Sequence, residues 1–168
     1  MSAIPQPSFD APVSVPTRTP YVEVWRNSAQ AGFTASAFTA FSFSEAFVDT
    51  HGFWSSAAPT RLTIPQGLAG VYQYELQWEE GAGTAFTGSS YIAVRSNGSF
   101  LLARESEANL TQFDNMRIFG QRRMSAGDYI EGLLFPATAA SYTNSHTSVS
   151  ANDPASPFMS LTRIGAFP

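Results

Sequence analysis

Residues 61–80 read RLTIPQGLAGVYQYELQWEE and contain the clearest periodic pattern in the chain. After Gly70, large apolar side chains occupy every second position, namely Tyr72, Tyr74, Leu76 and Trp78. The intervening positions are polar: Gln73, Glu75, Gln77 and Glu79. Successive side chains of a β-strand point to opposite faces, so this stretch predicts a strand that buries one row and exposes the other. The pattern is typical of a central strand in an antiparallel sheet with one wet face.

Similar short strand-like runs fill the rest of the chain, and turn residues separate them. The Asn97-Gly98 pair predicts a two-residue hairpin turn inside residues 91–104, because both residues tolerate a positive φ. Other predicted strands cover residues 21–27, 37–43, 113–124, 129–136 and 157–164. Residues 28–36 and 137–156 are interpreted as polar loops, and no amphipathic helix is indicated. The sequence therefore predicts an all-β fold, an antiparallel β-sandwich of the jelly-roll type.

One predicted strand differs from the others because it is apolar on both faces. Residues 129–136 read YIEGLLFP. In a sandwich, one face of such a strand meets the core, and the second must be covered by a loop or by another subunit.

The bulk composition narrows the classes of partner. The chain has 168 residues, of which only 13% are charged, about half the usual ~25%. Its net charge is −4 and it has no cysteine, which argues against nucleic-acid binding, disulfides and thiolate metal sites. Because no apolar run approaches ~18 residues, we expect no membrane insertion. The leading residues MSAIPQPSFD lack the pattern of a signal peptide, so we expect synthesis in a cytoplasm.

Residues 1–20 form a separate, proline-rich segment. Its five prolines exclude a helix and a central strand, so the segment should be extended. Apolar side chains recur between the prolines at Ile4, Phe9, Val13 and Val15. We interpret this segment as an anchoring arm that docks on a partner or a neighbouring copy, and residues 21–168 as the jelly-roll domain.

Three groups of residues, in this order, are similar to one family of β-sandwiches. The first group is 49–53 (DTHGF), 61–65 (RLTIP) and 70–72 (GVY); the second is 126–131 (AGDYIE); the third is 156–161 (SPFMSL). Together they resemble the trimeric jelly roll of complement subcomponent q heads and tumour necrosis factor, in the form found in virion proteins of tailed bacteriophages. The resemblance covers residues 21–168. The sequence departs from the family pattern at Leu62, where Phe is usual, in the extra residues Leu68 and Ala69, and in the last group, which lacks the family's Gly.

The resemblance implies a homotrimer in which inner sheets pack around a three-fold axis. Both chain ends would then lie at one end of the molecule, and the loops 81–90 and 137–156 would face outward. Since the strand at 129–136 has apolar residues to spare on its second face, it is our candidate for part of the interface. The candidate interface residues are Phe113, Phe119, Tyr129, Leu133 and Phe135.

The sequence indicates no catalytic centre. His51 and His146 could form a metal site with Asp49 and Asp153, but the Asp-x-His spacing is generic, and we predict no metal and no cofactor. The Gly-rich residues 81–90 lack the Lys-Ser/Thr of a phosphate loop. No strained Gly-x-Ser-x-Gly elbow is present either. We therefore expect a protein that is not an enzyme.

These observations lead to a structural protein of a bacteriophage virion as the first hypothesis. It would be a trimeric capsid decoration or head-fibre knob that residues 1–20 attach to the major capsid protein or another virion protein. A second hypothesis is a tail-associated knob that recognises a host-surface glycan. Its contact candidates are Tyr142, Asn144, His146 and Asn152. A third, a bacterial spore or cell-surface relative, is weakened by the missing signal peptide and the absence of collagen-like repeats.

Overall fold

The computed structural model describes residues 18–79, 87–109, 115–138, 140–142 and 157–166. Within these ranges every regular secondary-structure element is a β-strand. Five strands form one antiparallel sheet in the order β4-β1-β12-β6-β9. Their bounds are Glu45–Asp49, Tyr21–Trp25, Phe158–Ala166, Gly70–Glu79 and Asn115–Met124. The second sheet follows the order β3-β10-β7-β8, and β5 also pairs with β10. The bounds here are Thr39–Ala40, Tyr129–Phe135, Ser89–Ser96, Phe100–Ala108 and, for β5, Leu62–Thr63.

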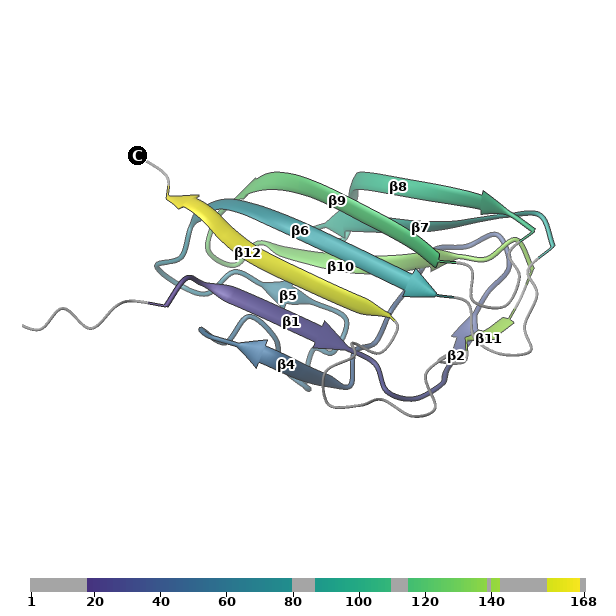
Figure 1. The fold of residues 1–168 in the computed structure, drawn as a ribbon, viewed down its shortest axis with the longest axis horizontal. Helices are drawn as coiled ribbons and strands as arrows, with labels where there is room; N and C mark the ends of the chain where they lie inside the picture. Colours follow the sequence, from purple (N-terminus) through teal and green to yellow (C-terminus); the bar gives the residue numbers. More distant parts are fainter. Residues whose placement is uncertain (1–17, 80–86, 110–114, 139, 143–156, 167–168) are drawn as a thin grey trace, which may run out of the picture.

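The two sheets pack face to face, so the predicted antiparallel β-sandwich is confirmed (Figure 1). Strand β6 is central in its sheet, because it is hydrogen-bonded to β12 on one side and to β9 on the other. The apolar row of β6 is buried as predicted: Tyr72, Leu76 and Trp78 are inaccessible and Tyr74 is 4% exposed. The polar row points to the opposite, outer face of the sheet.

The opposing sheet completes the core with aliphatic side chains of β7 and β10. Ile92, Val94, Ile130 and Leu134 are all buried and belong to the same apolar cluster as the β6 row. Gly132 lies between Ile130 and Leu134 on this face. A Cβ there would lie 2.7 Å from Leu76 Cδ1, so the missing side chain lets β6 pack closely on β10.

The predicted hairpin is confirmed, and its turn also locks two loops together. Asn97 and Gly98 adopt φ values of 51° and 72°, as a type I′ turn requires. The backbone N–H of Tyr129 donates to Asn97 Oδ1 (2.9 Å), and Asn97 Nδ2 donates to Asp128 Oδ1 (2.9 Å). The β7–β8 turn therefore holds the turn that precedes β10.

Two sequence predictions need correction. The run 37–43 contains only the short strand β3, and the supposed loops 28–36 and 137–156 contain a strand pair, β2 (Gln30–Phe33) with β11 (Ala140–Tyr142). The Gln30 side chain explains the first difference. Its Nε2 donates to the Ala40 carbonyl and its Oε1 accepts from the Ser42 N–H, both at 2.8 Å. A side chain thus satisfies backbone groups that a longer strand would pair with a neighbour.

The start of β1 and the end of β12 lie at the same end of the sandwich, as expected (Figure 1). The Arg163 N–H donates to the Pro20 carbonyl (2.9 Å) and extends this pairing toward the ends. Residues 1–17 lie outside the described residues, and with them the predicted arm positions Ile4, Phe9, Val13 and Val15.

The contact between β9 and β6 supplies a test of the packing. A Cβ at Gly120 would lie 2.1 Å from the Tyr74 Oη and 2.3 Å from its Cζ, inside the buried core. We expect Gly120→Ala to lower the unfolding free energy by about 1–3 kcal/mol, because the ring must move to make room. Urea denaturation measures the effect.

Gly165→Ala is the matched control, since its nearest contact would be Val71 Cβ at 3.8 Å, and it should change stability by less than about 0.5 kcal/mol. In the background of Tyr74→Ala, the added methyl group should cost much less. Equal stability of the two glycine variants would contradict the close approach of Tyr74 to β9.

Candidate interaction surfaces

The chain's own side chains cover much of the outer face of β10. Leu133 is only 1% exposed, and the Phe135 ring packs against Phe38 and Tyr91 with centroids 5.1 and 5.3 Å away. The sequence left open whether a loop or a second subunit covers this face. At Phe135 the cover is a loop of the same chain, because Phe38 belongs to the residues just before β3. Leu133 therefore has almost no surface to offer to a second copy.

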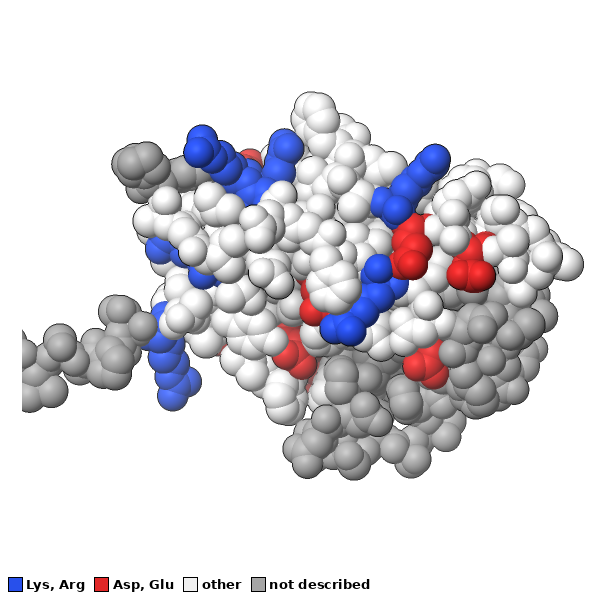
Figure 2. Space-filling view, turned by 45° about the horizontal axis from the view of Figure 1, so that its top comes forward, with Lys and Arg blue, Asp and Glu red and all other residues white. Residues whose placement is uncertain are grey.

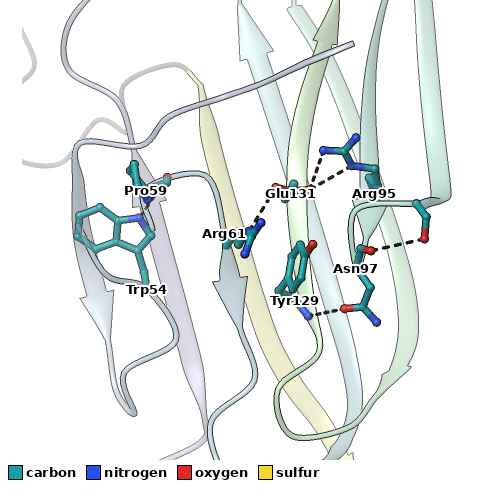
Figure 3. A network of polar contacts seen from close by, with 8 residues as sticks. Trp54, Pro59, Arg61, Arg95, Asn97, Tyr129 and Glu131 are labelled. Atoms are coloured by element: carbon teal, nitrogen blue, oxygen red, sulfur yellow. Dashed lines mark hydrogen bonds and ion pairs between the residues drawn. The ribbon is translucent and has the colours of Figure 1, made fainter. Parts of the chain in front are cut away.

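A buried carboxylate, Glu131, lies on the same face between two arginines (Figure 3). Arg95 donates from Nε and Nη2 to Glu131 Oε2, at 3.0 and 2.8 Å. Arg61 Nε lies 3.6 Å from Oε1, and the Arg61 guanidinium sits 4.2 Å from the centre of the Tyr129 ring. A carboxylate that is 5% exposed needs such partners, since an unpaired charge in this position would be costly. Tyr129 is thus partly covered by Arg61.

Sequence reasoning missed this network. The one signal was Glu131 itself, an acid in the middle of a strand that is apolar on both faces. Because the chain has no lysine, an arginine is the expected charged partner, but the sequence does not show which of the nine arginines it is, since that depends on long-range strand pairing. Arg95 comes from β7 and Arg61 from the residue before β5.

The outer face of the five-stranded sheet is partly exposed in the single chain, although Phe158 and Ser160 of β12 are buried there. The pairing registers set its side chains in rows across β9, β6, β12 and β1. One row is Phe119, Glu75, Ser160 and Glu23, and the next is Arg117, Gln77, Phe158 and Trp25. Phe47 of β4 adds a further aromatic ring, 5.4 Å from that of Trp25. We call this surface, defined by Glu23, Trp25, Phe47, Glu75 and Phe119, the outer β6 face.

Two phenylalanines stand out on the outer β6 face, since Phe119 is 55% and Phe47 51% exposed. The indole Nε1 of Trp25 is buried and, within the described ranges, has no hydrogen-bond partner. A buried donor without an acceptor is uncommon. The face thus has exposed aromatic area above a buried indole donor that has no acceptor in the described ranges.

The charges of this face already have partners inside the chain. Arg117 Nε donates to Glu75 Oε1 (2.6 Å), and the same guanidinium lies 4.6 Å from the centre of the Phe119 ring. The Tyr21 hydroxyl donates to Glu23. Burial raises the pKa of Tyr21, and the hydrogen bond to Glu23 and the negative charges of Glu23 and Glu75 raise it further, so the phenol stays a neutral donor. In Figure 2 the charged groups are few, and several basic and acidic side chains lie in contact with one another.

The candidate interface residues from the sequence do not form one patch. Phe119 lies on the outer β6 face, whereas Tyr129, Leu133 and Phe135 face outward from the opposite sheet. Strand alternation predicted each orientation, but it could not show that β9 and β10 belong to different sheets. Phe113, Asn144, His146 and Asn152 lie outside the described residues. Tyr142 is in β11, but its side chain is also outside the described part.

Asp49 and His51 are occupied with holding a turn. Asp49 Oδ1 accepts the backbone N–H groups of His51, Gly52 and Phe53 at 3.2, 2.7 and 3.0 Å, and Oδ2 accepts that of Trp54 at 2.9 Å. His51 Nδ1 lies 2.7 Å from Thr50 Oγ1. The described residues contain no group of three possible metal ligands, and no helix long and apolar enough to span a membrane. His146 and Asp153 lie outside the described residues.

Comparison with known proteins identifies the fold. No family model and no curated protein matches the sequence. Among solved structures, the globular domain of the zebrafish complement 1qA protein has a TM-score of 0.55 at 13% identity, over 89% of this chain and all of that one. Murine APRIL at pH 8.0 has a TM-score of 0.59 at 13% identity, over 88% of this chain and all of that one. The predicted jelly roll, as in complement 1q heads and tumour necrosis factor proteins, is therefore confirmed as the fold.

The Glu131 network can be tested by a double-mutant cycle. Arg95→Met leaves the buried carboxylate with only the longer contact to Arg61. Because Arg95 is itself 29% exposed, we expect a loss of about 2–3 kcal/mol of unfolding free energy, below the full effect for a buried pair. The double variant Arg95→Met/Glu131→Leu should regain most of this loss, since no charge is then left buried. Chemical denaturation measures both.

Arg104→Met is the matched control. It removes an arginine from β8 whose described contact is the Tyr91 ring, 5.4 Å away, and it leaves no buried carboxylate without a partner. Its cost should stay below about 1 kcal/mol. If the double variant were as unstable as Arg95→Met, the unpaired charge of Glu131 would not be the cause of the lost stability.

Proposed function

We propose that this chain acts by assembly, as a homotrimeric jelly-roll knob, and that the outer β6 face supplies contacts between copies. The observation that carries the proposal is the aromatic area of that face: Phe119 and Phe47 are each more than half exposed. Aromatic residues without nearby unpaired charge are typical of contact centres. The family that the sequence resembles is trimeric, which agrees with self-association.

We further propose that the trimer is a structural component of a bacteriophage virion. It would be a capsid decoration or head-fibre knob bound to the major capsid protein or another virion protein. The order of the three sequence groups that resemble phage virion proteins supports this proposal. So does the geometry of the leading residues: the described chain enters β1 at one end of the sandwich, so three arms can leave a trimer at its base. Three weak contacts at once would give strong binding by avidity.

A non-catalytic role fits the described polar groups. Glu131, Asp49 and Glu75 each hold an arginine or a set of backbone N–H groups. None is left in a cavity beside a nucleophile, as acid–base catalysis would need.

The interface is tested by Phe119→Glu. A new carboxylate in the centre of an aromatic contact should raise the dissociation constant of the trimer at least tenfold, about 1.4 kcal/mol, because the charge would lose its water. Size-exclusion chromatography with light scattering at micromolar concentration gives the mass. Phe100→Glu is the matched control, since Phe100 is 65% exposed but belongs to β8 of the other sheet.

The wild type and Phe100→Glu should have three times the chain mass, and Phe119→Glu should dissociate toward the monomer. A wild-type protein that is monomeric throughout this range would overturn the trimer. A Phe119→Glu trimer as tight as the wild type would place the contact elsewhere.

The arm is tested by deleting residues 1–17. The deletion stops there because the Pro20 carbonyl accepts from the Arg163 N–H and belongs to the sheet. We expect the shortened protein to keep its trimeric mass and to lose co-sedimentation with virus particles that lack the protein. The full-length variant Ile4→Ser/Phe9→Ser/Val13→Ser/Val15→Ser should also stay trimeric and lose co-sedimentation, because it lacks the apolar anchoring side chains. Shortened trimers that decorate particles as well as the full chain would exclude anchoring by the arm.

A further inference from the structure

A cavity of about 490 Å³ opens at the end of the sandwich where β1 begins and β12 ends. Its walls come from residues 18–20 before β1, from the turn after β4, from the loop before β6, and from residues 163–166. Three of the described lining residues are Arg18, His51 and Arg163, and none of the described lining residues is acidic. Figure 2 shows basic side chains at this end of the molecule, on the left of the view. In a chain of net charge −4, such a cavity is a local exception.

The basic groups of the cavity keep unused donors. The Arg163 guanidinium donates from Nη2 to the Ala69 carbonyl (2.7 Å), whereas its Nε is buried and has no hydrogen-bond partner. The structure shows no partner for the Arg18 guanidinium within the described ranges. His51 faces Thr50 Oγ1 through Nδ1, which leaves Nε2 available. A guanidinium carries five N–H donors and stays charged. The buried Nε of Arg163 is not accessible to a ligand, so the donors that remain for one are the other N–H groups of Arg163 and those of Arg18.

None of the described residues that line the cavity is a carboxylate. The acid nearest in sequence to His51 is Asp49, and both of its oxygens accept backbone N–H groups of residues 51–54. Positive groups in a recess with low-dielectric walls strengthen the local field and raise the concentration of anions there.

Arg163 is held in place before any ligand binds. Its backbone N–H donates to the Pro20 carbonyl, and a register shift between Arg163 and Gly165 re-aims this part of β12. Gly70 lies directly beside the side chain: a Cβ there would be 2.6 Å from Arg163 Nε and 2.4 Å from the Gly165 carbonyl oxygen. Glycine at this position is therefore required for the guanidinium to lie where it does. Preorganised donors of this kind bind at low entropic cost.

We propose that this cavity is an oxyanion-binding site for a phosphate or carboxylate group. The Arg163 and Arg18 guanidinium groups supply charge-assisted N–H donors, and His51 Nε2 supplies a third contact. Guanidinium groups suit this ligand class because their paired donors match the oxygens of phosphate and carboxylate. The volume also admits more than one small ion, in the range of ordinary ligand pockets. The site lies within one chain, so it stands independently of the trimer and of the virion proposal.

The test is a titration of the full chain at pH 7 with inorganic phosphate, with citrate, and with sodium chloride at matched ionic strength. NMR signals of the His51 ring report binding, and His51→Gln assigns them against those of His146. We expect a saturable shift with phosphate or citrate and none with chloride. Arg163→Gln and Arg18→Gln should each weaken binding about tenfold, because each removes charged hydrogen bonds.

Arg122→Gln is the matched control, since Arg122 is an exposed arginine of β9 outside the cavity, and it should bind like the wild type. Arg18→Gln decides the matter if Arg163→Gln fails to fold, because Arg18 is exposed and makes no described contact that the fold needs. A response to phosphate alone or to citrate alone supports the site and identifies the ligand class. An equal response to chloride, no saturable shift, or unchanged affinity in Arg18→Gln would overturn the proposal.

Discussion

The position of β6 between β12 and β9 constrains the rest of the molecule. Its pairing with β9 runs without a break from Gly70 opposite Met124 to Glu79 opposite Asn115. A slip of one residue would turn the Tyr72–Trp78 row toward water and the glutamine and glutamate row into the core, so burial fixes the register. From β6 the register passes to β12 and on to β1. The side chains that form the rows of the outer β6 face are therefore determined by which side of β6 is buried.

The two outer faces of the sandwich have different fates. On β10, the chain covers its own apolar surface with Phe38 and Arg61 and neutralises Glu131 with arginines. On the five-stranded sheet, the aromatic rings of Phe47 and Phe119 remain exposed next to carboxylates that are already paired. This contrast moves the proposed contact between copies away from β10 and toward β6. It also leaves the cavity at the end of the sandwich as a separate feature, whose two arginines form no ion pair with a carboxylate of the described ranges.

Local sequence patterns predicted those features of the fold that depend on residues close together in the chain. Alternation identified β6, and Asn97-Gly98 identified the hairpin, because both depend on residues close together in the chain. Alternation also showed that β10 needs a cover on its second face, but the cover, Phe38, is far away in sequence. The β2–β11 pair and the partners of Glu131 were missed for the same reason: they depend on non-local contacts without apolar periodicity. Phe119 was predicted as an interface residue, but the sequence did not show to which of the two sheets it belongs. The arm and the outer-loop candidates lie in segments that the structure does not describe.

The pairing of β1 with β12 has a mechanical consequence. Hydrogen bonds in an antiparallel ladder run perpendicular to the strands. A pull on residues before Tyr21, resisted by the body of the domain, acts along the axis of β1. It therefore loads all rungs to β12 and β4 together, in shear, and does not open them one after another. A module held by its leading residues against drag would thus resist extraction with its whole first strand.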